Sequence, residues 1–332
     1  MKIGIFGTGS WASALAQVLV DNKHDVFLYG NCQNQIDEIN LKHANTTYFK
    51  DVVLDEKIKA TNTIKEVIDF AELLLLVVPT HAVKIVLDDI NKFLNRPLVF
   101  VNAAKGFDPE TNLRMSQIIR KVIPKEKITA VVSLLGPSHA EEVIKRRLTL
   151  IASVSKKKKA AKLVQNLFSN DYFRVYLLQD EVGAEYATAM KNAIALGAGI
   201  IDGLGLGDNA KAALITRGLN EMVKFGAHFH AKEKTYLGLT GIGDLVVTCG
   251  SKHSRNYQAG YQIGLENSAI NVLKVKNITI EGIRTTKVIY EISKQQNIDL
   301  PIISALYRVL FENAKPNEVI NLLMKRSLKE EK

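Results

Sequence analysis

The most apolar segment of the chain carries one isolated cation. Lys191 is the only charged side chain between Tyr186 and Ile201, a run built largely from Ala, Gly, Ile, Leu and Met. Such a run predicts a helix that is buried on most of its circumference, where an ammonium group is costly unless it is paired or faces a wet cleft. Because burial can turn lysine into a proton donor or acceptor, we interpret Lys191, with Asn192 beside it, as the floor of an active site. The alternative is a lysine whose amine reaches the surface from a core helix.

A carboxylate and a second cation lie farther along the chain. Asp244 stands in a glycine-flanked turn, and an acid near Lys191 would supply the partner that a buried ammonium requires. Farther on, Ser254 is followed by Arg255 and Asn256. An arginine at a helix start can grip a phosphate in bidentate fashion. The alternative is an exposed loop in which Ser254 is an ordinary helix cap.

Polar residues also follow two apolar runs in the first half. Lys105 comes after the run at 98–102, and in an open parallel sheet ligands bind beyond the carboxyl ends of the strands. We therefore expect Lys105 to face a bound substrate or cofactor, with a free surface lysine as the alternative. Ser138 with Glu141 fits a capping box, so a structural role competes there with anion binding at the helix start. We interpret His139, between them, as a local hydrogen-bonding residue.

A glycine-rich segment, 7–12, directly follows the first strand-like run and opens the first helix. Gly7 allows a tight turn, Gly9 lets a pyrophosphate approach the backbone, and the small Ala12 lets helix and strand pack closely. The segment predicts a dinucleotide site, with an ordinary glycine turn as the alternative. At the end of the second strand an acid would favour NAD and an arginine would favour NADP. The chain has Asn31 there, which leaves the choice of cofactor open.

The hydrophobic pattern changes once along the chain. The first 180 residues alternate short apolar runs with helical patterns, which predicts an α/β fold with a Rossmann-type, doubly wound parallel sheet. We expect strands at 2–6, 25–29, 58–61, 73–78, 98–102, 130–134, 148–154 and 172–178, with helices between them that include 11–21, 82–93 and 112–121. From residue 181 helical periodicity dominates, and we expect helices at 181–201, 210–229, 254–265, 282–295, 301–311 and 316–325. We therefore predict an NAD(P)-binding domain at 1–180 and an all-α substrate domain at 181–332, with a small-molecule site in a cleft between them.

Length, composition and charge limit the kinds of protein that this chain can be. The 332 residues are enough for two domains. No uncharged apolar run reaches the ~18 residues that span a bilayer, and because a strand pattern begins at residue 2 we expect no signal peptide. The two cysteines offer neither a disulfide framework nor metal-ligand spacing, so we expect a cytoplasmic protein without a metal. The net charge of +10 includes the basic runs 145–147 and 156–159. Neither run belongs to a nucleic-acid-binding module, so we expect no nucleic-acid partner.

In these motifs the chain resembles the bacterial NAD(P)-dependent glycerol-3-phosphate dehydrogenases, and the resemblance covers nearly the whole chain. Its most specific pieces are Ala104-Lys105-Gly106, Gly136-Pro137-Ser138-His139-Ala140-Glu141-Glu142, Met190-Lys191-Asn192, Gly207-Asp208-Asn209-Ala210-Lys211-Ala212-Ala213-Leu214, Gly243-Asp244-Leu245, Ser254-Arg255-Asn256 and Glu281-Gly282. The resemblance implies a homodimeric, cytoplasmic enzyme that reduces dihydroxyacetone phosphate to sn-glycerol 3-phosphate with NADH or NADPH, for phospholipid synthesis.

The resemblance also implies a role for each matching residue. Lys191 would be the proton donor and acceptor, and its catalytic surroundings would be Lys105, Asn192, Asp244 and Thr248. The substrate-binding set would be Lys105, Gly136, Ser138, Lys191, Asp244, Ser254, Arg255 and Asn256. The cofactor would touch Gly7, Gly9, Ser10, Trp11, Asn31, Lys105, Ala140, Arg255, Thr279 and Glu281.

The chain departs from the family pattern at four positions. Ala12 and Ser13 stand where Gly and Thr are usual, a change that keeps both residues small. Asn31 replaces a basic residue, which weakens the case for NADP. Thr279 stands where an aliphatic residue is common.

Two other functions are compatible with these motifs and candidate site residues. A β-hydroxyacid-type dehydrogenase acting on another phosphorylated substrate would also join a dinucleotide fold to a helical domain with an inward lysine. The segment 254–256 argues against it. A catalytically silent nicotinamide-dinucleotide sensor would bind cofactor without turnover, which the presence of Lys105, Lys191, Asp244 and Arg255 disfavours.

Overall fold

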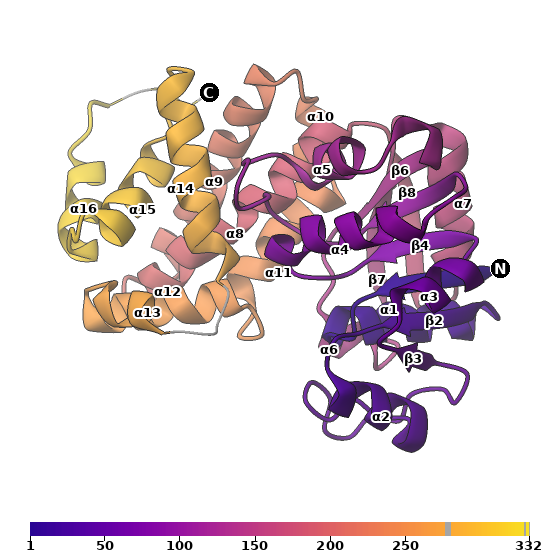
Figure 1. Ribbon diagram of the computed structural model, residues 1–332. Coiled ribbons are helices and arrows are strands. Elements are labelled where there is room, and N and C mark those ends of the chain that lie inside the picture. Colours follow the sequence, from indigo (N-terminus) through magenta and orange to yellow (C-terminus); the bar gives the residue numbers. More distant parts are fainter. Residues whose placement is uncertain (276–279, 329, 332) are drawn as a thin grey trace. The chain divides into compact units, whose positions relative to one another are not determined.

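The computed structural model describes residues 1–275, 280–328, 330 and 331, so the predicted cofactor residue Thr279 lies outside the described residues. The chain divides into two compact units, Met1–Glu185 and Tyr186–Lys332. The first unit combines a sheet with helices, and the described part of the second is helical (Figure 1). The predicted fold class, a Rossmann-type doubly wound sheet followed by helices, is confirmed.

One eight-stranded sheet, in the order β3-β2-β1-β4-β5-β6-β7-β8, forms the centre of the first unit. Its strands are β1 (Lys2–Phe6), β2 (Asp25–Tyr29), β3 (Lys59–Thr61), β4 (Leu73–Leu76), β5 (Leu98–Asn102), β6 (Ile128–Leu135), β7 (Thr149–Val154) and β8 (Phe173–Leu178). Neighbouring strands are parallel except β6 and β7, which are antiparallel. The connection at 136–148 holds only the one-turn helix α6 (Ala140–Val143). It is too short for a helical crossover, so β7 starts at the edge where β6 ends.

Helices cover both faces of this sheet. Besides α6 they are α1 (Ser10–Asp21), α2 (Gln33–Lys42), α3 (Ile64–Phe70), α4 (Thr80–Phe93), α5 (Met115–Val122), the 3-10 turn η1 (Lys125–Lys127) and α7 (Lys158–Phe168). Along β4, Leu73 and Leu75 join one hydrophobic cluster with α1, whereas Leu74 and Leu76 join another with α3, α4 and α5. Burial on both faces explains why this strand is an unbroken apolar run.

The second unit is a group of helices. They are most of α8 (Glu181–Gly203), then α9 (Gly207–His228), α10 (Glu233–Tyr236), the π-helical turn η2 (Leu239–Gly243), α11 (Asp244–Gly250), α12 (Arg255–Glu266), α13 (Ile270–Lys274), α14 (Glu281–Gln295), α15 (Pro301–Phe311) and α16 (Pro316–Met324). The six helices predicted from residue 181 onward are confirmed to within one turn at each end. The pattern does not predict α10, α11 or α13, because a helix of at most two turns leaves no room for the apolar spacing to repeat. Among the described helices, none combines the length and apolar character that crossing a membrane requires.

The first turns of α8 carry two buried carboxylates that belong to the first unit. Glu185 Oε2 accepts hydrogen bonds from Arg114 Nη1 at 2.6 Å and from Ser116 Oγ at 2.7 Å, and Glu181 Oε2 accepts from Arg120 Nη2 at 2.6 Å. Acidic groups at a helix start are favourable because the N–H ends of the peptide dipoles point toward them. The start of α8 is thereby tied to α5.

Another carboxylate caps the start of α15. Glu221, from α9, accepts the N–H of Ile302 on Oε1 at 2.6 Å and the N–H of Ile303 on Oε2 at 3.1 Å. Its side chain is buried, and burial raises the pKa of Glu221 to about 7 against the opposing effect of the two hydrogen bonds. The folded protein therefore holds this proton more tightly than the unfolded chain does.

We predict that Glu221 makes the free energy of unfolding decrease as pH rises from 4.5, the ordinary pKa of the acid, to about 7. The decrease should reach up to about 3 kcal/mol, because the stabilisation from a raised pKa is complete while the group is protonated in both states and is lost as pH rises through the folded pKa. Urea unfolding across this window should show a difference between wild type and Glu221→Gln that changes with pH. A difference that is independent of pH would contradict the account.

Candidate active site

The ammonium group of Lys191 is paired. Lys191 is only 4% exposed, and its Nζ donates to Asp244 Oδ1 at 2.5 Å and to Thr248 Oγ1 at 2.9 Å. Asp244 and Thr248 lie four residues apart in α11 and so share one face of that helix. The alternative interpretation, an amine that reaches the surface from a core helix, does not hold.

A tight turn places Asp244 in this cluster. The turn η2 directly precedes α11, and at Gly241 its backbone leaves helical geometry, with φ −100° and ψ −105°. A Cβ at Gly241 would lie 2.1 Å from the carbonyl oxygen of Tyr236, so glycine is required for the chain to pass this close to α10.

Nearby in α11, burial raises the pKa of Cys249 to about 12. The thiol therefore stays neutral beside the ion pair.

Two buried asparagines connect three helices next to Lys191. Asn256 Nδ2 donates to Asn192 Oδ1 at 3.0 Å, and the N–H of Gly282 donates to Asn256 Oδ1 at 2.8 Å. A Cβ at Gly282 would lie 2.4 Å from the carbonyl oxygen of Asn192. These contacts hold α12 and the start of α14, where Glu281 lies, against α8.

The start of α12 carries the predicted phosphate-binding residues. Ser254 is the N-cap, and its Oγ accepts the N–H of Tyr257 at 3.2 Å, so the helix-cap interpretation of Ser254 is confirmed. Arg255, the first residue of α12, is exposed, whereas Asn256 is buried. An exposed guanidinium at the N-terminus of a helix suits an anion.

In the first unit the loops after β5 and β6 meet. Lys105 is half-buried, and its Nζ donates to the carbonyl oxygen of Gly136 at 3.0 Å and to Ser138 Oγ at 3.3 Å. Lys105 is therefore not the free surface lysine of the alternative interpretation. Gly136 has φ +145°, and a Cβ there would lie 3.0 Å from the Cα of Ile151, so this turn requires glycine.

The capping box that was the structural alternative for Ser138 and Glu141 does not form. Helix α6 begins at Ala140, and its N-cap is His139, which makes no side-chain capping bond. The hydroxyl of Ser138 instead donates to the carbonyl oxygen of Gly136 at 3.0 Å. The turn at Gly136 places the hydroxyl oxygen of Ser138 beside the Lys105 loop. This oxygen therefore does not cap the helix α6.

The turn after β1 has the geometry that a dinucleotide needs. Gly7 has φ +129°, and a Cβ there would lie 2.6 Å from the carbonyl oxygen of Val77. A Cβ at Gly9 would meet no atom within 4 Å, which leaves the open space by which a pyrophosphate approaches the backbone. Gly9 is also the N-cap of α1 and gives its N–H groups no side-chain cap. The first turn of α1, with Ser10 and Trp11, therefore fits a bound dinucleotide phosphate.

For two further predicted cofactor residues the structure gives positions only. Asn31 is exposed just after β2, and Ala140 is buried at the first position of α6. No hydrogen bond from a described residue to the side chain of Asn31 fixes a role for it, and the methyl group of Ala140 can make none.

The sequence gives no signal for Asn45, which holds the glycine turn in shape. Asn45 is fully buried, and its Nδ2 donates to the carbonyl oxygen of Thr8 at 2.8 Å and to Ser13 Oγ at 2.9 Å. It lies 37 residues from Thr8 along the chain, in a polar segment without periodicity. Only the fold brings this amide to the turn, so neither motif nor spacing could indicate it.

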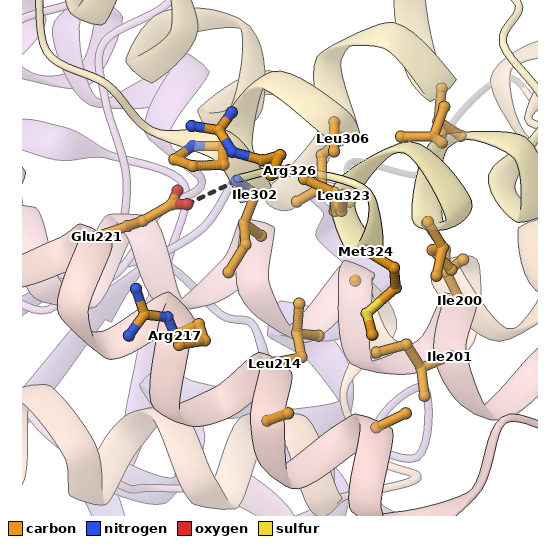
Figure 2. A pocket seen from close by; sticks show the side chains of 18 of the residues that line it. Ile200, Ile201, Leu214, Arg217, Glu221, Ile302, Leu306, Leu323, Met324 and Arg326 are labelled. Atoms are coloured by element: carbon orange, nitrogen blue, oxygen red, sulfur yellow. Dashed lines mark hydrogen bonds between the residues drawn. The ribbon is translucent and has the colours of Figure 1, made fainter. Parts of the chain in front are cut away.

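A cavity of about 520 Å³ lies among the helices of the second unit. Apolar side chains of α8, α9, α15 and α16 form most of its wall, among them Ile200, Leu306 and Met324, with Arg217 and Glu221 toward one end (Figure 2). None of the predicted site residues lines it. The cavity is therefore separate from the Lys191 cluster.

Comparison with known proteins accounts for both units. Residues 2–161 match the family model described as NAD-dependent glycerol-3-phosphate dehydrogenase N-terminus, and residues 180–321 match the model for the C-terminus of the same enzymes. The chain belongs to this family. The predicted resemblance is confirmed.

Relatives and solved structures agree with the family models. A glycerol-3-phosphate dehydrogenase of Streptococcus uberis, specified for NAD(P)+, is 48% identical over 99% of this chain and 98% of its own length. Its counterpart in Listeria innocua is 45% identical over 100% of this chain and 98% of its own length. The crystal structure of glycerol-3-phosphate dehydrogenase from Coxiella burnetii superposes with a TM-score of 0.90 at 30% identity, covering 98% of this chain and 99% of that one.

We predict that Asn45→Ala weakens NADH binding about tenfold. Loss of two buried hydrogen bonds, worth about 1 kcal/mol each, lets the glycine turn relax. Trp11 is the only tryptophan of the chain and lies in the first turn of α1, so the quenching of its fluorescence in an NADH titration measures the dissociation constant directly.

Asn40→Ala is the matched control for this experiment. Asn40 also makes two hydrogen bonds, both with the backbone of Ala60 at 2.8 Å and neither with a residue of the glycine turn. An equal loss of affinity in both variants, or none in Asn45→Ala, would refute the role of Asn45.

Proposed function

We propose that this protein is an NAD(P)-dependent oxidoreductase that reduces dihydroxyacetone phosphate to sn-glycerol 3-phosphate. The observation that carries the proposal is the buried hydrogen-bonded group of Lys191, Asp244 and Thr248. Membership of the glycerol-3-phosphate dehydrogenase family supports it, as do relatives of nearly equal length that bear this enzyme's name.

Lys191 is proposed as the acid that protonates the substrate. A bound nicotinamide would supply a hydride to the carbonyl carbon, and the carbonyl oxygen would then need a proton. The Lys191 ammonium donates its proton to that oxygen. Asp244 keeps the amine charged until that transfer. Thr248 accepts a hydrogen bond from the amine and so fixes its direction. The hydroxyl of Thr248 itself donates to the carbonyl oxygen of Asp244 at 2.6 Å.

The remaining predicted residues are proposed to orient the substrate. Lys105, held by Gly136 and Ser138, would add positive potential where the oxyanion forms. Arg255 would grip the phosphate group, supported by the helix start at Ser254 and by Asn256 and Asn192.

The dinucleotide is proposed to bind at the turn after β1. Gly7, Gly9, Ser10 and Trp11 would hold its phosphates at the start of α1. Asn31 would lie beside the adenosine ribose, where a neutral amide favours neither cofactor strongly. Lys105, Ala140, Arg255 and Glu281 complete the proposed contacts, and Thr279, outside the described residues, is retained as a proposal from the resemblance alone.

We further propose a cytoplasmic homodimer that supplies sn-glycerol 3-phosphate to phospholipid synthesis. Its two cysteines are free thiols, and Cys249 is buried, which is compatible with a reducing compartment. Dimer formation and the metabolic role come from the family resemblance.

Loss of reduced-cofactor absorbance on addition of dihydroxyacetone phosphate tests the proposed function, with NADH and NADPH compared at matched concentrations. We predict turnover by the wild type and a fall in kcat of about 10²- to 10⁴-fold in Lys191→Met, because the general acid is lost. The Trp11 fluorescence titration should show unchanged NADH affinity in the variant.

Three outcomes would count against this assignment. Retention of most wild-type turnover by Lys191→Met would remove the lysine from the chemistry. Preference for another phosphorylated β-hydroxy acid in a substrate panel would favour the related dehydrogenases. Cofactor binding without turnover of any carbonyl substrate would favour a sensor.

A further inference from the structure

We propose that Asp202, Tyr257 and Lys211 are positioning residues that fix the start of α12, and with it Arg255, relative to Lys191. None of the three has a role in the function proposed above, and the inference rests on that function because it takes Arg255 as the phosphate ligand. It concerns only the second unit, where α8, α9 and α12 all lie.

Helices α8 and α12 touch backbone to backbone. A Cβ at Gly199 of α8 would lie 2.1 Å from the carbonyl oxygen of Tyr257, and a Cβ at Gly260 of α12 would lie 1.9 Å from that of Leu196. The pattern repeats one turn on, where a Cβ at Gly203 would lie 2.2 Å from the carbonyl oxygen of Tyr261. Glycines spaced by four residues on both helices thus permit a contact that any side chain would open.

A contact made of glycines has few side chains to interlock. In ordinary helix packing, ridges of side chains enter grooves of the neighbour and resist sliding. Where both surfaces are smooth backbone, other groups must set how far one helix shifts along the other. The structure provides these groups on the flank of the contact.

Asp202 provides the flanking connection. Its Oδ2 accepts the hydroxyl of Tyr257 at 2.6 Å and the ammonium of Lys211 at 2.8 Å. Burial and the adjacent carboxylate raise the pKa of Tyr257 to about 12, and the hydrogen bond to Asp202 raises the pKa of Lys211. Both donors therefore keep their protons at neutral pH, so both can donate to Asp202 under assay conditions.

This connection reaches the substrate-binding end of α12. Tyr257 lies two residues after Arg255, and its N–H is the donor to the Ser254 cap. On the other side, Asn256 is bonded to Asn192, the neighbour of Lys191. The start of α12 is thus held to α8 at two points. Loss of one allows Arg255 to shift relative to Lys191, which loosens its grip on the phosphate group and so weakens substrate binding.

Tyr257→Phe and Lys211→Met test the inference, each removing one donor to Asp202. We expect the KM for dihydroxyacetone phosphate, and the inhibition constant of inorganic phosphate, to rise about tenfold while kcat falls less than about threefold, because the phosphate grip is loosened and Lys191 keeps its partners. NADH affinity from Trp11 fluorescence should be unchanged. Having two variants guards against one that fails to fold.

Tyr261→Phe is the matched control. Tyr261 lies four residues along the same helix, stacks on Tyr257 with a centroid separation of 6.4 Å, and is 41% exposed, so loss of its hydroxyl should leave KM unchanged. An unchanged KM in both test variants, or an equal rise in the control, would overturn the positioning role while leaving the proposed function intact. A wild-type protein that fails to reduce dihydroxyacetone phosphate would overturn both.

Discussion

Burying a single positive charge in an apolar helix is the constraint on which the site depends. Removing an ammonium from water costs several kcal/mol even after the protein relaxes, and two hydrogen bonds from Lys191, to Asp244 and Thr248, offset that cost. An apolar side chain would fill the same place in α8 without the cost, so stability does not explain a lysine at this position. The proton donation proposed for Lys191 would explain it, because an amine held without bulk water transfers its proton along one defined direction.

Close backbone approaches place the partners of this lysine. Gly241 lets the chain turn against α10 just before Asp244, Gly282 lets α14 start against Asn192, and Gly260 lets α12 lie on α8. Any side chain at these three positions would push a neighbouring element away. The geometry of the site therefore depends on residues that have no functional group at all.

The long, periodic parts of this fold follow from the sequence, and the exceptions have physical causes. The run at Leu73–Leu76 and the α8 pattern are strong because burial on nearly all sides leaves few positions for a polar residue. The helix α11 and the turn η2 are too short to show a period. The antiparallel step between β6 and β7 depends on what a short connection can reach, which the strand pattern alone does not encode.

Some residues of the candidate site can likewise be found from the sequence, and others cannot. Lys191 is found from its apolar surroundings, and the glycine turn from its spacing after β1. Asn45 could not be found, because its two bonds join segments 37 residues apart. The spacing of Ser138 and Glu141 left a capping box open as an alternative, and the turn at Gly136 overrides that spacing.

The most direct test of the central claim is the pH dependence of kcat for reduction of dihydroxyacetone phosphate, compared between wild type and Asp244→Asn. Because the carboxylate favours the protonated amine of Lys191, its removal should move the alkaline fall of the rate to lower pH and reduce the maximal rate. An alkaline limb at the same pH in both proteins would show that the Lys191–Asp244 pair does not control the proton, and would contradict the account.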